Sequence, residues 1–176
     1  PGLLAARELA TGPVLGIAEA AMHAASFVAT GFSVVTTLGR TKIIAEHLAH
    51  AYGMAHFCRK VRACELDVLA LEDAGSDALR IITEECLRAR DEDGAGAIVL
   101  GCGGMADLAR AIEADIGVPV IDGVTVATKF VEALVGCGLR TSKHGDLAYP
   151  LPKPYAGAFA NLAPKPVMWT RELTRG

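Results

Sequence analysis

The sequence predicts an α/β fold in which a parallel sheet carries helices on both faces. We expect one complete Rossmann-like domain and, in addition, the remnant of a pseudo-symmetric partner domain. Short apolar runs alternate with stretches of helical spacing from residue 32 to residue 137. Four such strand–helix units in a row favour a right-handed parallel sheet. The second observation is an internal repeat, because residues 1–31 resemble residues 104–136.

Local signals mark the limits of the four strands and four helices that follow residue 32. Gly53 and Gly136 lie where helices favour glycine after their last turn, and Ser76 is a good N-cap. The expected strands are Ser33–Leu38, Lys60–Ala63, Ala97–Leu100 and Val118–Ile121. The expected helices are Thr41–Tyr52, Ser76–Arg90, Met105–Ala114 and Val124–Val135. Their inward faces are expected to carry Ile44, His47, Leu48 and Ala51, then Leu79, Ile82 and Cys86, and then Val124, Ala127, Val131 and Leu134.

The composition is that of a globular enzyme-sized domain. The chain has 176 residues, of which 52% are hydrophobic and only 5% aromatic, so the core must be aliphatic and rich in alanine. The formal net charge is −3 and basic residues do not cluster, which argues against a nucleic-acid partner. The uncharged stretch 20–38 is explained better by a buried helix followed by a buried strand than by a membrane span.

The cysteine pattern points to a reduced, cytoplasmic protein. Five cysteines in a chain of this size are an odd number, and they do not suggest a disulfide framework. No Cys-x-x-Cys pair is present, so we expect no metal site, although His56, Cys58 and Cys64 lie near one another in sequence.

The stretch from Ala97 to Gly104 is the strongest candidate for a functional site. It reads Ala-Ile-Val-Leu-Gly-Cys-Gly-Gly, so a buried strand would end at Cys102 and a helix would begin directly after it. Open α/β sheets bind ligands at this edge, where the positive end of a helix favours a thiolate. Most free cysteines are small buried hydrophobes. The flanking glycines, however, leave room for a ligand to approach the backbone, and we therefore predict that Cys102 is catalytic.

The internal repeat bears on the domain organisation. Gly12–Leu15 matches Gly117–Ile121 with one inserted residue, and an alanine-rich helix that ends at a glycine follows each segment. The counterpart of Cys102 would then lie upstream of Pro1, so we expect a fragment of a longer two-domain protein. The expected domains are a remnant of the first α/β domain (1–31), the complete second domain (32–137) and a proline-rich extended tail (138–176).

Seven short motifs occur along the chain in a characteristic order. They are Pro1-Gly2-Leu3, Pro13–Ala21, Val34–Leu38, Leu100–Met105, Pro119–Val124, Gly138–Lys143 and Pro152–Tyr155. In this order they resemble the hydantoin racemase family, which includes allantoin racemases and belongs to the aspartate/glutamate racemase superfamily. The resemblance covers about residues 1–157.

The resemblance implies two similar α/β domains with the active site between them and a tail that returns to the first domain. It also implies that each domain contributes one cysteine and that catalysis needs no cofactor. Cys102 matches the second-domain cysteine, and the first is expected just upstream of Pro1. The implied substrate is a small carbon acid such as a hydantoin or allantoin. A chain that holds one cysteine and half of the cleft is expected to be inactive by itself.

The expected chemistry is racemisation at C5, because loss of the proton next to a carbonyl gives an enolate-like anion. Cys102 would serve one face of the ring. We expect the backbone N–H groups of Gly103 and Gly104, with Thr36 and Thr37 at the end of the first strand, to hold the oxyanion. For the two threonines, filling of a β-strand is the alternative interpretation.

Other functions and roles stay open at this point. A single-cysteine malonate decarboxylase of the same superfamily is one alternative, and an inactive ligand-binding or oligomerising remnant is another. Exposed apolar surface on an incomplete domain would favour a homo-oligomer. Elsewhere, Glu19 and Asp122 are interpreted as helix caps, and the acidic residues 91–93 as a solvated turn.

Overall fold

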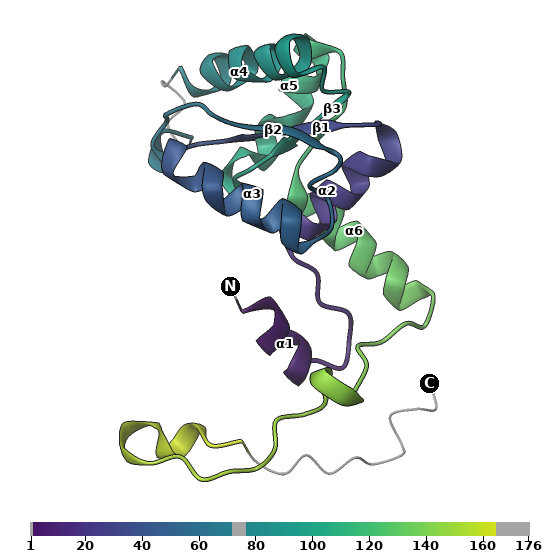
Figure 1. The fold of residues 1–176 in the computed structure, drawn as a ribbon, viewed down its shortest axis with the longest axis vertical. Coiled ribbons are helices and arrows are strands. Elements are labelled where there is room, and N and C mark those ends of the chain that lie inside the picture. The colour runs from purple at the N-terminus through teal and green to yellow at the C-terminus, as the bar shows by residue number, and fades with distance from the viewer. Residues whose placement is uncertain (1, 72–76, 165–176) are drawn as a thin grey trace. The chain divides into compact units, whose positions relative to one another are not determined.

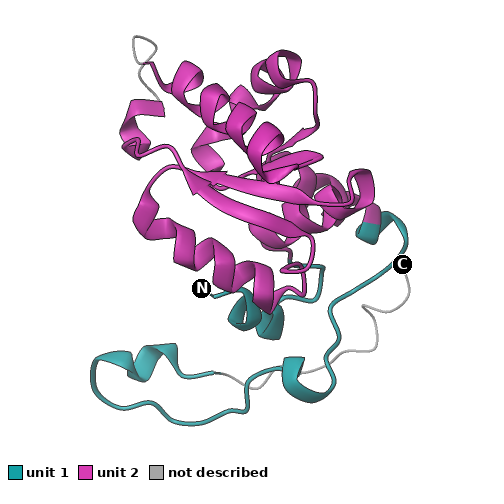
Figure 2. Cartoon of the chain, turned by 45° about the horizontal axis from the view of Figure 1, so that its top comes forward, with its two compact units in different colours: residues 1–14, 134–176 teal, residues 15–133 magenta. Residues whose placement is uncertain are grey.

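The computed structural model describes residues 2–71 and 77–164. The chain forms two compact units, one of residues 15–133 and one of residues 1–14 together with 134–176 (Figure 2). The larger unit is an α/β structure built on a four-stranded parallel sheet with strand order β2-β1-β3-β4. The strands are β1 (Phe32–Thr36), β2 (Cys58–Ala63), β3 (Ala97–Leu100) and β4 (Val120–Ile121).

Helices cover both faces of this sheet (Figure 1). The α-helices of the larger unit are α2 (Ile17–Val28), α3 (Lys42–Ala51), α4 (Ala78–Asp93), α5 (Ala109–Ile116) and the start of α6 (Gly123–Gly136). Side chains of successive strand residues point to opposite faces. Val35 of β1 therefore packs with α4 and α5 in one core cluster, whereas Val34 packs with α2 and α3 in the other. Both β1 and β3 are buried along their whole length, as expected for the centre of a parallel sheet.

The predicted strands and helices agree with the structure in order and type. Strand limits differ by at most two residues, and the third strand is as predicted. The helix expected from Met105 begins as a short 3-10 helix, η3 (Gly103–Leu108), before α5 follows. Ser76, predicted as the N-cap of α4, lies outside the described residues.

The inward faces of α3, α4 and α6 were predicted incorrectly in part, and in α4 the exception is Leu79, which is 39% exposed. In α3 the buried residue is Ala49, whereas His47 is exposed and Ile44 is 55% exposed. The small side chain of Ala49 takes the inward position of this helix, and the larger side chains of Ile44 and His47 lie on its outer side. In α6 Ala127 is buried, but Val124 is 44% exposed and Val131 and Leu134 are half-buried.

The position of α2 differs from the predicted division of the chain. The expected first-domain remnant ended at Gly31 and so included this helix. In the structure Ala21, Met22 and Ala25 of α2 pack against β1 and β3, within the larger unit. The division of the sequence into three domains stays a prediction. The larger compact unit of the structure runs from Leu15 to Ala133.

The smaller unit holds α1 (Leu3–Leu9) and two short 3-10 helices, η4 (Gly145–Leu147) and η5 (Gly157–Leu162). Lys143 links its two chain segments, because Nζ donates to the carbonyl oxygens of Arg7 and Glu8 at 2.5 and 3.0 Å. In residues 2–71 and 77–164, every helix is too short or too polar to cross a lipid bilayer.

A buried ionic cluster ties β1, β2 and α4 together. The guanidinium of Arg62 on β2 binds both carboxylate oxygens of Asp93, at 2.7 and 2.5 Å, and also Glu85 and Glu92. Ser33 of β1 donates a further hydrogen bond to Asp93 at 3.0 Å. The predicted solvated turn at residues 91–93 is therefore wrong for Asp93, which is the last residue of α4 and whose side chain is only 6% exposed.

This cluster predicts a loss of stability in acid. Hydrogen bonds from Arg62, and to a smaller extent from Ser33, lower the pKa of Asp93. A carboxyl whose pKa is lower in the folded state stabilises the fold above its unfolded pKa of about 3.9. That contribution is lost as the pH falls through the lower, folded-state pKa. Urea unfolding between about pH 5 and pH 3 should show a steeper decline for the parent chain than for Asp93→Asn. Equal declines would contradict this assignment.

Candidate functional site

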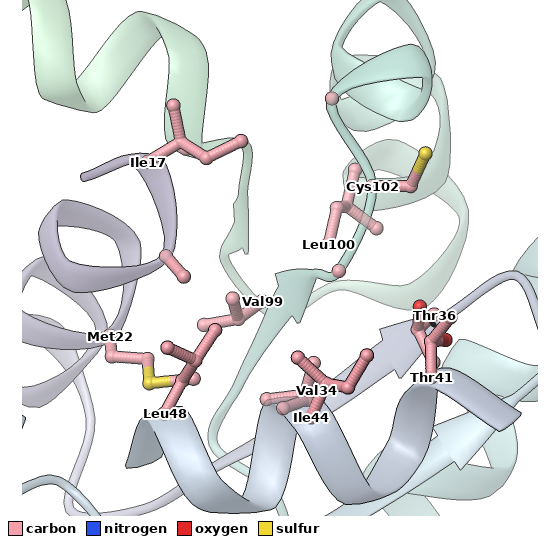
Figure 3. Close-up of a pocket in the computed structure, with 15 residues that line it drawn as sticks. Ile17, Met22, Val34, Thr36, Thr41, Ile44, Leu48, Val99, Leu100 and Cys102 are labelled. Atoms are coloured by element: carbon pink, nitrogen blue, oxygen red, sulfur yellow. Dashed lines mark hydrogen bonds between the residues drawn. The ribbon is translucent and has the colours of Figure 1, made fainter. Parts of the chain in front are cut away.

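A cavity of about 250 Å³ lies at the carboxyl ends of β1 and β3 in the larger unit. Thr36 at the end of β1 and Leu100 at the end of β3 line it, and the loop Gly101–Gly103 forms part of its rim. The cavity extends between α2 and α3 along mainly apolar walls (Figure 3). The wall residues are Ile17, Ala18, Met22, Val34, Ile44, Ala45, Leu48 and Val99. This edge of the sheet is where the sequence predicted a ligand site.

Cys102 lies in the loop that leads from β3 into η3. Its backbone is extended, with φ −139° and ψ 132°, and it occupies the N-cap position of the 3-10 helix. The side chain is half-buried and packs against the core cluster that includes Met105, with Leu71 nearby. Figure 3 shows the sulfur directed away from Ile17 and Met22, on the outer side of the loop. Cys102 thus lies at the cavity rim, with its sulfur turned away from the apolar walls.

The glycines beside Cys102 keep this loop free of side chains. A Cβ on Gly104 would lie 3.8 Å from Sγ of Cys102 and 3.2 Å from a methyl group of Leu71. The N–H groups of Gly103 and Gly104 precede that of Met105, which donates to the carbonyl oxygen of Cys102. The first N–H groups of a helix have no partner within it. The N–H groups of Gly103 and Gly104 therefore have no partner within η3.

Gly101 allows β3 to approach Thr36 of β1. A Cβ on Gly101 would lie 2.8 Å from the Cβ of Thr36 and 3.1 Å from its hydroxyl oxygen, which is closer than normal packing permits. We expect Gly101→Ala to displace the end of β3 and to lower the free energy of unfolding by about 1–3 kcal/mol, the usual cost of overpacking.

Gly136→Ala is the matched control for this substitution. A Cβ there meets no heavy atom within 4 Å, and alanine is the better helix former, so we expect unchanged or higher stability. Urea denaturation of both variants checks this prediction, and a Gly101→Ala variant as stable as Gly136→Ala would contradict it.

Two hydroxyl groups form a short chain at the cavity. Thr41 donates from Oγ1 to the carbonyl oxygen of Leu38 at 2.6 Å, and its Oγ1 lies 3.0 Å from that of Thr36. A hydroxyl group has a single proton, so the proton between the two threonines comes from Thr36. The lone pairs of Thr36 Oγ1 are therefore unused in these two bonds. Thr37 is 3% exposed and lies outside the cavity lining described here, and its carbonyl oxygen accepts from the N–H of Leu66.

Three of the other cysteines are held in the thiol form. Burial raises the pKa of Cys58 to about 11 and those of Cys64 and Cys86 to about 12, with smaller contributions from nearby acidic groups. Such thiols contain little thiolate at neutral pH and are poor nucleophiles and bases. The fifth cysteine, Cys137, is exposed and belongs to the smaller unit. Within the described part of the chain, histidine, cysteine and acidic residues form no group that could hold a metal ion.

The predicted helix caps lie beside the cavity. Glu19 accepts a hydrogen bond from the N–H of Gly16 at 3.1 Å at the start of α2, and Asp122 accepts one from the N–H of Thr125 at 2.8 Å at the start of α6. Gly123 lies so close to α2 that a Cβ would be 2.4 Å from the carbonyl oxygen of Ile17. The two segments related by the internal repeat therefore meet at one side of the cavity.

Several cavity residues were not predicted from the sequence. Thr41 enters the lining from a short 3-10 helix, η1 (Gly39–Thr41), and Ile44 and Leu48 enter it from α3. Thr41 could have been found as a second threonine five residues after Thr36. Ile44 and Leu48 were recognised as apolar positions of α3, but their spacing was interpreted as core packing. Ile17 was part of a recognised motif but had no role assigned.

The fold and the cavity define an α/β protein with a cysteine at the carboxyl edge of a parallel sheet. The family model described as Asp/Glu/Hydantoin racemase matches residues 1–131. A hydantoin racemase from Rhizobium meliloti is 52% identical over 157 residues, and one from Pseudomonas sp. (strain NS671) is 45% identical over 161 residues. These alignments cover 89% and 92% of this chain. They cover 65% of each relative.

Solved structures give the same result. The allantoin racemase from Klebsiella pneumoniae matches with a TM-score of 0.88 and 60% identity, over 94% of this chain and 67% of that one. The allantoin racemase from Pseudomonas fluorescens matches with a TM-score of 0.85 and 43% identity, over 89% and 67%. The chain belongs to the Asp/Glu/hydantoin racemase family, which confirms the resemblance and the α/β fold predicted from the sequence. It spans 65% of the length of the first two curated relatives.

Proposed function

We propose that this chain supplies one half of a racemase site that acts at C5 of a hydantoin, allantoin or related cyclic ureide. The observation that carries the proposal is the position of Cys102, half-buried at the glycine-lined rim of a cavity of about 250 Å³. The relatives named hydantoin racemase and the structures named allantoin racemase support the substrate class.

In the proposed step the Cys102 thiolate removes the C5 proton. The C5–H bond breaks, an S–H bond forms, and the electron pair delocalises from C5 onto the adjacent carbonyl oxygen. The N–H groups of Gly103 and Gly104 would stabilise this developing oxyanion, as preorganised donors do in acyl-transfer enzymes. Sγ reaches the ring from another staggered rotamer about Cα–Cβ, because in its present rotamer it points away from the apolar walls.

Inversion requires a second acid on the opposite face of the ring. We propose that a cysteine of the pseudo-symmetric domain provides it, so that each thiol acts as base for one enantiomer and as acid for the other. Neither a metal nor a cofactor enters this scheme, because the ring carbonyl next to C5 itself takes up the electron pair that the proton leaves behind.

Deuterium exchange at C5 tests the proposed function. A single enantiomer of 5-methylhydantoin is incubated in D₂O with the 176-residue chain, and loss of the C5–H signal is followed by NMR against a protein-free sample. The chain by itself is expected to be inactive as a racemase, because inversion needs the second thiol. The proposal nevertheless predicts C5 exchange faster than the background, because one thiolate is enough to exchange the proton. Exchange at the background rate would count against it.

A further inference from the structure

We infer that the hydroxyl oxygen of Thr36 accepts a hydrogen bond from a ligand N–H, and that this contact selects cyclic ureides over carboxylate-bearing carbon acids. The inference rests on the proposed function for its substrate class. The family description names both dicarboxylic amino acids and hydantoins, so it leaves open which of the two ligand classes this site prefers. The direction of the hydrogen bond at Thr36 distinguishes between them.

The direction follows from the two threonine hydroxyl groups. The proton of Thr41 is used in the 2.6 Å bond to the carbonyl oxygen of Leu38, and the proton of Thr36 is used in the 3.0 Å bond to Thr41. Each hydroxyl oxygen has two lone pairs, and the bond that Thr36 donates uses neither of its own. Thr36 can accept a hydrogen bond from a ligand but has no proton left to donate.

The position of Thr36 brings this acceptor next to the reacting loop. Thr36 lines the cavity, and its Oγ1 is 3.1 Å from the point where Gly101 would carry a Cβ. Gly101 directly precedes Cys102. A ring whose C5 lies at Cys102 would thus reach Thr36 with an N–H of the same ring.

The other side chains of the lining do not favour a carboxylate. Among the described residues that line the cavity there is no lysine, arginine or histidine, and the other walls are mainly apolar. A carboxylate at Thr36 would place its oxygen lone pairs against those of the hydroxyl oxygen and would lose hydration without gaining a charged partner. A neutral amide N–H placed there gains a hydrogen bond.

Binding measured by NMR titration tests this inference on the full 176-residue chain. The probes are hydantoin, 1-methylhydantoin, 3-methylhydantoin and methylmalonate. The variants are Thr36→Val, which keeps the shape and removes the acceptor, and Thr36→Ser, which keeps the hydroxyl group. Thermal melts establish that each variant is folded.

For the parent chain we expect hydantoin to bind and methylmalonate to bind at least tenfold more weakly. Thr36→Val should weaken hydantoin binding about tenfold, the effect of one lost hydrogen bond, whereas Thr36→Ser should stay close to the parent. One of the two N-methyl isomers lacks the N–H that would donate to Thr36. That isomer should bind to the parent about as weakly as hydantoin binds to Thr36→Val, and its affinity should be the same for Thr36→Val and the parent.

Thr41→Val gives an independent test of the hydrogen-bond direction. It removes the acceptor of the Thr36 proton, which leaves Thr36 free to donate. The ratio of hydantoin affinity to methylmalonate affinity should therefore fall in Thr41→Val.

Three outcomes would overturn the inference: equal hydantoin affinity in Thr36→Val and the parent, equal affinity of the parent for hydantoin and methylmalonate, or no hydantoin binding. These titrations need no turnover. A chain that binds as expected but does not exchange the C5 proton would refute the proposed function and leave the role of Thr36 intact. A chain that exchanges the C5 proton but binds hydantoin equally well in Thr36→Val would refute the role of Thr36 and leave the proposed function intact.

Discussion

Cys102→Ser is expected to slow deuterium exchange at C5 of a hydantoin by about 10²–10⁴-fold, the usual contribution of a positioned acid or base. Serine has nearly the same shape as cysteine, so the loop between β3 and η3 should keep its conformation. Its hydroxyl group has a much higher pKa than a thiol and supplies almost no base at neutral pH. The loss should appear in the exchange rate at saturating hydantoin, with binding little changed.

Cys137→Ser is the matched control, because that cysteine is exposed and lies in the smaller unit. It should exchange at the parent rate. The raised pKa values of Cys58, Cys64 and Cys86 make these thiols poor substitutes for Cys102 as a base. Parent-like exchange by Cys102→Ser would mean that another group removes the proton.

Arg62→Met is expected to have the largest effect on stability, a loss of about 3–5 kcal/mol in the free energy of unfolding. Methionine approximately fills the space of the arginine stem but removes the buried guanidinium from Asp93 and Glu85. Asp93 then keeps only Ser33 and the exposed Lys60 at 3.9 Å, and Glu85 keeps the exposed Arg88. Both carboxylate side chains are at most 10% exposed, and a buried charge that loses its buried partner is costly. Urea unfolding at neutral pH measures the change.

Arg80→Met is the control for this prediction. Arg80 pairs with Asp77 and Glu84 on the exposed face at the start of α4, and its side chain is 56% exposed. Exposed ion pairs contribute little, so this variant should unfold close to the parent. If both arginine variants lost the same stability, the burial of the Arg62 cluster would not be what stabilises the fold.

The arrangement of strands was predictable because both faces of this sheet are covered. Strands buried on both faces read as continuous apolar runs, and residues 97–100 are the clearest case. The candidate site was predictable at Cys102 for a related reason. A cysteine between glycines at the end of such a run must lie at the carboxyl edge, wherever the helices pack.

Contacts between distant parts of the chain were not predictable in the same way. The acidic end of α4 has the composition of an exposed turn, and only the pairing of β2 with β1 brings Arg62 to Asp93, 31 positions away in sequence. The contribution of α3 to the cavity was missed for a packing reason. Ala49 takes the inward position, which leaves Ile44 and Leu48 to line the cavity.

The proposed function requires a ligand to occupy the cavity beside Cys102, and such a ligand should protect that thiol from alkylation. The chain is alkylated with iodoacetamide with and without saturating 5-methylhydantoin, and mass spectrometry measures the labelling rate of each cysteine. We predict that the ligand slows labelling of Cys102 and leaves that of the exposed Cys137 unchanged. Labelling of Cys102 at the same rate with and without saturating ligand would contradict binding of the ligand in this cavity.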